Sequence, residues 1–134
     1  MKATELQIGD YVRISHRNKI GKVYRIDRAN GEGNGFAAVI DGDYHEEDLE
    51  PIPLQRIHLI KNGFEADKED ETFIYEDGYE VRVSFEGGCK ELELEPYIYL
   101  NINFAEKHLS MEIENLHQLQ QAMRIMGCDK TIEL

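Results

Sequence analysis

The chain has 134 residues, of which 41% are hydrophobic, and two cysteines, which argues against global disorder and against a disulfide scaffold. The N-terminal residues lack an apolar signal region and no apolar run approaches the roughly 20 residues that span a bilayer, so we expect a soluble, cytoplasmic protein with reduced cysteines. A formal net charge of −12 opposes binding to nucleic acid or anionic membranes wherever that charge is spread evenly.

Residues 1–52 alternate short apolar-rich runs with Gly, Asn and Asp. The alternation predicts strands at 11–15, 20–26, 36–40 and 47–52, separated by a turn at 18–21, a glycine-rich loop at 30–35 and an Asp-Gly turn at 41–43. Short, strongly bent strands of this kind are typical of a small SH3-like β-barrel. Such barrels mostly bind other molecules, so this half points away from catalysis.

A helix is predicted at 53–62, because Leu54, Ile57 and Ile60 recur at helical spacing and Asn62-Gly63 supplies a stop. Pro53 suits the first turn of that helix. An acidic loop is expected at 65–71.

The second half is predicted to be an antiparallel meander that ends in a helix. Strands are expected at 72–76, 79–86, 90–95, 97–104 and 108–113, and a helix at 115–126 with a capping box formed by Asn115 and Gln118. The fold class is therefore α+β, with an SH3-like barrel at 1–52 and a sheet-plus-helix region at 53–134. Both halves are short, and we expect them to share a core near 51–64.

The segment 13–28, called the basic hairpin below, reverses the overall charge. Residues 11–29 contain six Lys and Arg against Asp27 alone, whereas residues 30–50 contain seven acids and no base. The candidate nucleic-acid contacts are Arg13, Arg17, Lys22, Arg25 and Arg28, with Tyr24 available to stack on a base. The alternative is a solvated ribbon whose charges keep an edge strand from aggregating.

Alternation along 97–104 separates an apolar face from a face of two tyrosines and two asparagines. This second set, called the tyrosine strip below, consists of Tyr97, Tyr99, Asn101 and Asn103. Aromatic and amide side chains of this kind suit a protein interface. The alternative is the exposed face of an ordinary sheet.

No metal, cofactor or catalytic residue is expected. The acidic segment 41–48 offers oxygen ligands, but His45 and Glu46 stand where an EF-hand loop needs Asp or Asn and Gly. Cys128 and His117 have no spacing that fixes a nucleophile and its base.

Four segments resemble a family of small uncharacterised proteins of gut bacteria and their prophages. They are Glu5-Leu-Gln-Ile-Gly-Asp-Tyr-Val12, Glu50-Pro-Ile-Pro-Leu54, Lys61-Asn-Gly-Phe64 and Leu116-His-Gln-Leu-Gln120. The chain departs from the family at 122–126, where similar proteins carry an aromatic-rich helix. The resemblance implies a mobile-element context and carries over no catalytic residue.

Together these observations predict a non-enzymatic intracellular interaction module of phage or mobile-element origin, which binds another protein or itself. One alternative is a nucleic-acid-associated accessory protein that uses the basic hairpin. The other is an acidic decoy that mimics DNA, which the net charge of −12 permits.

Overall fold

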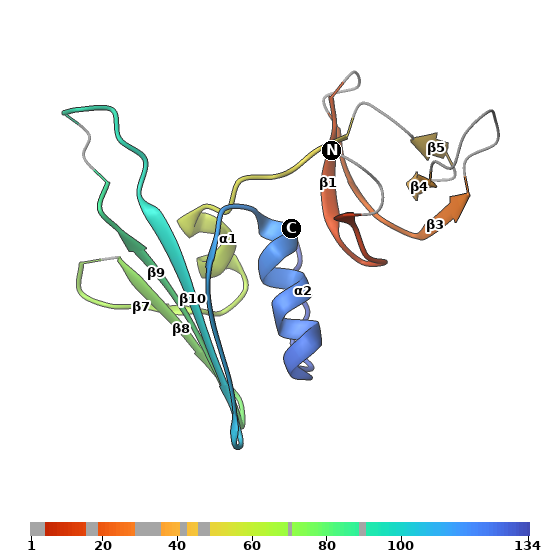
Figure 1. Cartoon of the computed structure of the whole chain (residues 1–134). Helices are drawn as coiled ribbons and strands as arrows, with labels where there is room; N and C mark the ends of the chain where they lie inside the picture. Colours follow the sequence, from red (N-terminus) through yellow and green to blue (C-terminus); the bar gives the residue numbers. More distant parts are fainter. Residues whose placement is uncertain are drawn as a thin grey trace. The chain divides into compact units, whose positions relative to one another are not determined.

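The computed structural model describes residues 5–15, 19–28, 36–40, 43–45, 49–69, 71–88 and 91–134. The described part is an α+β fold made mostly of strands, with two helices (Figure 1). Its contacts divide the chain into two compact units, Met1–Ile52 and Pro53–Leu134.

The N-terminal unit contains two three-stranded antiparallel sheets. One has the order β2 (Lys19–Lys22), β1 (Tyr11–Ile14), β6 (Leu49–Glu50), and the other has the order β3 (Arg25–Arg28), β4 (Phe36–Ile40), β5 (Asp43–His45). The described strands do not close into a barrel. Of the strand predicted at 47–52, Leu49 and Glu50 form β6, Pro51 and Ile52 lie outside it, and 47–48 lie outside the described residues. The turn predicted at 18–21 is wrong over its described part, because Ile20 and Gly21 pair with β1 inside β2.

The single strand predicted at 20–26 is in fact two strands, β2 and β3, which meet at Val23 and Tyr24. The Val23 N–H donates to the Asp10 carbonyl at 2.8 Å, on the side of the first sheet. The Tyr24 N–H donates to the Val39 carbonyl of β4 at 2.9 Å, on the side of the second sheet. The chain therefore changes sheets between two consecutive residues.

A small core fills the N-terminal unit. It consists of Leu6, Val12, Ile14, Val23, Ile40 and Leu49, all buried. Gly21 lies against this core so closely that a Cβ there would overlap Cγ2 of Ile40. Since β2 and β4 belong to different sheets, the missing side chain of Gly21 lets the two sheets approach each other.

The C-terminal unit is a five-stranded antiparallel sheet with two helices. The strands are β7 (Glu65–Ala66), β8 (Thr72–Glu76), β9 (Glu80–Glu86), β10 (Tyr97–Phe104) and β11 (Lys107–Ile113), in the order β11-β10-β9-β8-β7. The helices are α1 (Arg56–Lys61) and α2 (Leu116–Met126).

The predicted alternation of buried and exposed side chains is confirmed in this sheet. Val81, Val83 and Phe85 of β9 and Ile98, Leu100 and Ile102 of β10 are buried on one face. Helix α2 packs against β10 and β11 and buries its own stripe of Leu116, Leu119, Met123 and Met126. The predicted capping box is also present, since the Asn115 N–H donates to Gln118 Oε1 at 2.9 Å.

Three predictions about local structure in this unit are wrong. Helix α1 begins at Arg56 rather than Pro53, because Pro53 and Leu54 are extended and pair with the chain at Asn115 and Glu114. The acidic loop at 65–71 begins with the short edge strand β7. No strand forms over the described residues of 90–95, because Glu91–Glu93 turn with Glu93 at φ 55° and β10 pairs directly with β9.

Hydrogen bonds from side chains hold the C-terminal tail against the rest of the unit. Asn62 is buried, and its amide donates to the Glu133 carbonyl at 2.8 Å and accepts from the Glu133 N–H at 2.7 Å. The Tyr79 hydroxyl donates to Asp129 Oδ1 at 2.9 Å and accepts from the Lys130 N–H at 3.0 Å.

Candidate functional site

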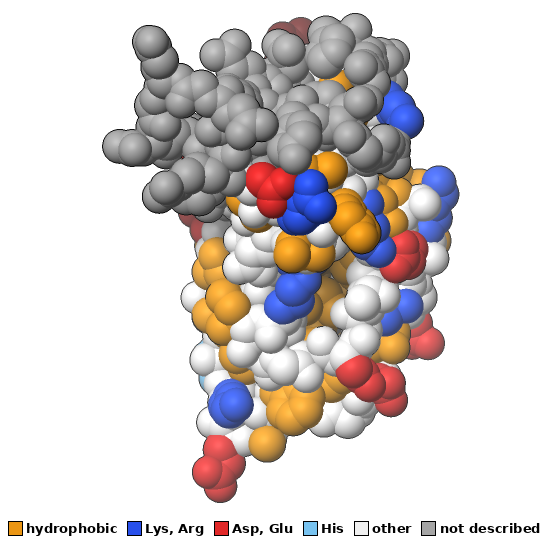
Figure 2. Space-filling model, turned by 90° about the vertical axis from the view of Figure 1, so that its right-hand side faces the viewer, with side chains coloured by type: hydrophobic (Ala, Val, Ile, Leu, Met, Phe, Trp, Pro, Cys, Tyr) orange, Lys and Arg blue, Asp and Glu red, His pale blue; other side chains and the backbone are white. Residues whose placement is uncertain are grey.

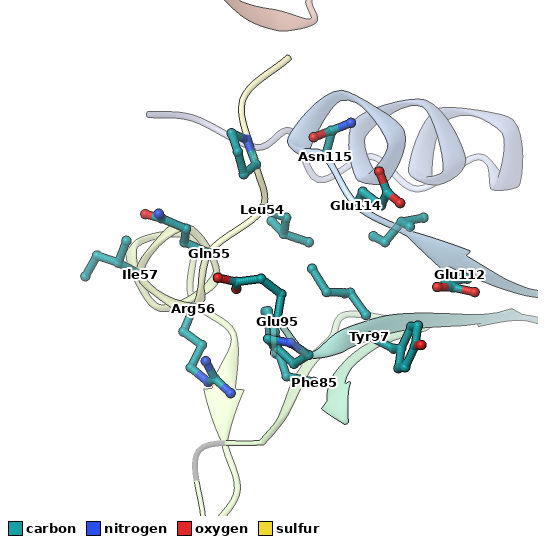
Figure 3. A pocket seen from close by; sticks show the side chains of 14 residues that line it. Leu54, Gln55, Arg56, Ile57, Phe85, Glu95, Tyr97, Glu112, Glu114 and Asn115 are labelled. Atoms are coloured by element: carbon teal, nitrogen blue, oxygen red, sulfur yellow. The ribbon is translucent and has the colours of Figure 1, made fainter. Parts of the chain in front are cut away.

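A groove of about 980 Å³ lies at one end of the five-stranded sheet in the C-terminal unit (Figure 3). Three separate stretches of the chain form most of it: residues 53–57, 95–98 and 112–115, together with Phe85 of β9. All of these residues belong to one compact unit. We call this site the end groove.

Backbone pairing holds the first wall of the end groove in place. The Leu54 N–H donates to the Glu114 carbonyl at 3.0 Å, and Pro53 forms an antiparallel bridge with Asn115. The Gln55 N–H donates to His58 Nδ1 at 3.0 Å, which caps helix α1. Burial, with a smaller effect from Lys61, lowers the pKa of His58, so the ring stays neutral and Nδ1 can accept this bond.

The floor of the end groove is apolar. Leu54, Phe85, Ile98 and Ile113 line it, and each of them is buried among neighbouring side chains. The Arg56 guanidinium lies over the Phe85 ring, 4.5 Å from its centroid, so a cation already occupies one part of this apolar wall. Because these four residues are almost fully buried, the apolar surface on which a further side chain can pack comes from the exposed lining residues Ile57 and Tyr97.

Carboxylates surround this floor. Glu95, Glu112 and Glu114 line the groove and are exposed, against the single guanidinium of Arg56. Figure 3 shows Glu95 extending toward the start of α1. Such a rim favours a cationic ligand and disfavours an anionic one.

The tyrosine strip adjoins the end groove. Tyr97 lines the groove and is 58% exposed, and Tyr99 is 40% exposed. Asn101 is half-buried, and exposed Asn103 is bonded through Oδ1 to Nδ1 of His108 at 2.6 Å. Both tyrosines of the strip are thus exposed, and Tyr97 joins the strip to the groove.

Sequence reasoning identified the tyrosine strip but missed the end groove. The strip follows from alternation within a single strand, whereas the groove joins segments that lie far apart in the sequence. The nearest signal was the presence of acids in two of the lining segments, Glu95-Pro-Tyr97 and Glu112-Ile-Glu114. Without the pairing of Leu54 with Glu114, nothing places these acids around one floor.

Only some candidate contact residues of the basic hairpin lie close together in the structure. Lys22, Tyr24 and Arg25 line a depression of about 590 Å³ in the N-terminal unit, next to exposed Ile8. Tyr24 is 72% exposed. Arg13 does not line this depression, while Arg17 and the side chain of Arg28 lie outside the described residues.

Three described cations of the hairpin, Arg13, Lys22 and Arg25, lie close to acidic or aromatic side chains. The Arg25 Nε lies 2.7 Å from Asp27 Oδ2, the Arg13 Nε lies 4.0 Å from Glu50 Oε2, and the Lys22 ammonium lies 5.5 Å from the centroid of the Tyr11 ring. Figure 2 shows Lys and Arg, Asp and Glu and hydrophobic side chains interspersed on one face of the described residues. The two ion pairs reduce the positive charge that this segment presents to a nucleic acid.

Other chemistries find little support in the part of the chain that the structure describes. No group of three His, Cys, Asp or Glu side chains there can hold a metal ion, and of the acidic segment 41–48 only the backbone of β5 is described. Burial, reinforced by Asp129, raises the pKa of the Cys128 thiol, which lowers its thiolate population and its reactivity. None of the described helices has the length and apolar character needed to cross a bilayer.

No family model matches the chain, and neither a curated protein nor a solved structure matches it.

Proposed function

We propose that the chain is a non-enzymatic interaction module that binds a protein partner through the end groove and the adjoining tyrosine strip. The partner segment carries an apolar side chain next to a Lys or Arg. The observation that carries this proposal is the combination of an apolar floor with a rim of three carboxylates in one groove.

The energetics favour such a ligand. Burying one Leu- or Phe-sized side chain on the floor contributes about 1.5–3 kcal/mol, which supplies the anchor. A basic side chain beside it meets Glu95, Glu112 and Glu114, which adds selectivity and a faster encounter more than raw affinity. Tyr97 and Tyr99 extend the contact area with rigid aromatic rings, a residue type enriched at interfaces.

We further propose that the N-terminal unit is an SH3-like module. In support, β2 and β3 follow each other directly through Val23 and Tyr24, so this stretch of chain contributes to both three-stranded sheets. The approach of β2 to β4 at Gly21 is what two sheets packed face to face require. In this proposal the N-terminal unit either provides a second binding surface or has a purely structural role.

The proposal is tested by selecting random 12-residue peptides on phage against the full chain. The selected peptides should combine an aliphatic or aromatic residue with Lys or Arg. Their synthetic forms should lose at least roughly tenfold in affinity toward a Tyr97→Ala variant, which removes an anchor, and toward Glu95→Lys, which reverses the rim charge.

Tyr24→Ala is the control, because it removes another exposed tyrosine from the other unit. Binding should be unchanged in this variant. Peptides rich in Asp or Glu, or peptides whose affinity falls in Tyr24→Ala and not in Tyr97→Ala, would contradict the proposal.

Nucleic-acid binding is the second candidate function, because Lys22, Tyr24 and Arg25 share one depression. Fluorescence anisotropy with labelled single- and double-stranded oligonucleotides tests it at low and moderate salt. Binding that weakens with salt and vanishes in an Arg17/Lys22/Arg25 triple-Ala variant would support this function, and an absence of binding at low salt would exclude it.

A further inference from the structure

Strand β11 is the edge of the five-stranded sheet, and within the described residues no strand pairs with its outer side. The strand is seven residues long, Lys107–Ile113, and most of its side chains are exposed. An edge of this length presents a row of N–H and C=O groups that can pair with another strand.

The hairpin geometry indicates which residues present these groups. Phe104 and Lys107 flank the two-residue turn at Ala105 and Glu106, so they form the hydrogen-bonded pair that closes it. Because bonding alternates along an antiparallel ladder, the backbone groups of His108, Ser110 and Glu112 face away from β10. Glu114 comes next in this series, and its carbonyl indeed accepts from Leu54 rather than from β10.

We propose that this edge pairs with β11 of a second copy of the chain, antiparallel about a two-fold axis at Ser110. The two sheets then become one continuous sheet, joined by about six backbone hydrogen bonds from three hydrogen-bonded residue pairs. The inference does not rest on a ligand in the end groove, and Glu112 is the residue of the dimer pairs that also lines that groove.

The side chains of β11 complement themselves in this register. On the face of the tyrosine strip, His108 lies opposite Glu112 of the second copy, and Ser110 lies opposite Ser110. On the other face, Leu109 lies opposite Met111, which is 37% exposed in the single chain. A His–Glu pair that can hydrogen-bond and an apolar pair across the strands each favour pairing, and the symmetry makes each of these two pairs occur twice.

The same register brings the interface next to the tyrosine strip. Tyr99 lies opposite Glu112 and Asn101 lies opposite Ser110 in the pairing of β10 with β11. The strip from each copy therefore continues across the joined sheet, which gives the dimer a larger outer face than either copy has alone.

Sedimentation equilibrium of the full chain across a concentration series tests the proposal. We expect a monomer–dimer equilibrium for the native chain. His108→Glu places Glu opposite Glu, and Glu112→Lys removes the carboxylate opposite His108, so each should raise the dimer Kd roughly tenfold. The double variant places Glu opposite Lys, and its Kd should return to near the native value.

Ser110→Pro provides a second variant that does not depend on charge. Its ring removes an outward N–H and blocks the centre of the edge, while the bonds of β11 to β10 remain. It should abolish the dimer and leave the circular dichroism spectrum and the thermal midpoint close to native. A chain that stays monomeric up to about 1 mM would overturn the proposal. So would a dimer whose Kd is unchanged by Ser110→Pro and by both single charge variants.

Discussion

The backbone N–H of Leu54 donates to the carbonyl of Glu114 across 3.0 Å, which joins the first residues of the C-terminal unit to the end of its edge strand. One consequence is that Leu54 becomes part of the floor of the end groove. The other is that the free part of the β11 edge ends before Glu114. The same bond thus limits both surfaces through which the chain can meet a partner.

Replacing Asn62 should show how much the C-terminal tail contributes to stability. Asn62→Ala removes two hydrogen bonds with Glu133 and a third to the His58 carbonyl, and leaves these groups without their buried partner. We expect the free energy of unfolding in urea to fall by about 2–3 kcal/mol. The exposed Asn103→Ala serves as the control and should change it by less than about 0.5 kcal/mol.

Substitutions in two tight turns should change the free energy of unfolding in opposite directions. Ala105 has φ 53°, in the left-handed region, and we expect Ala105→Gly to stabilise the chain by about 1 kcal/mol. Gly78 has φ 76° and a Cβ added there meets no atom within 4 Å, so Gly78→Ala should cost about 1 kcal/mol through the backbone alone. Urea unfolding of both variants measures these changes, and equal signs would refute the turn geometry.

The contact between Gly21 and Ile40 tests how the two N-terminal sheets pack. Gly21→Ala places a methyl group against Ile40 Cγ2 and should destabilise the chain by about 1–3 kcal/mol. In an Ile40→Ala background the same substitution should cost much less, because the opposing methyl group is gone. A double-mutant cycle by urea unfolding gives the coupling, and additive effects would mean that the sheets do not meet at this point.

Acidification should weaken the chain through His58. Its folded-state pKa lies below the ordinary value, so below about pH 6.5 the unfolded chain binds more protons than the folded one and the free energy of unfolding falls. Protonation of Nδ1 also removes the acceptor for the Gln55 N–H. Urea unfolding between pH 5 and 8 should show a smaller decline in His58→Gln, and identical pH profiles would argue against this role.

The sheet of the C-terminal unit could be predicted because one buried face imposes a period of two on β8, β9 and β10. Helix α2 could be predicted from its apolar stripe and its capping box. Two of the failures share one cause, which is that pairing with a distant segment overrides the local sequence pattern. Leu54 pairs with Glu114 and so shortens α1, and Val23 and Tyr24 pair with different partners and so divide one strand into two.

An NMR titration shows directly whether peptides bind at the end groove. The ¹⁵N-labelled chain is titrated with a short peptide that alternates Leu and Lys, and with a matched Leu and Glu peptide. We expect the largest shift changes at Leu54, Tyr97, Ile98 and Glu114 with the Lys peptide, and small changes with the Glu peptide. Equal responses to both peptides, no response at these residues, or changes centred on Lys22 and Tyr24 would contradict the assignment of the end groove as the binding site.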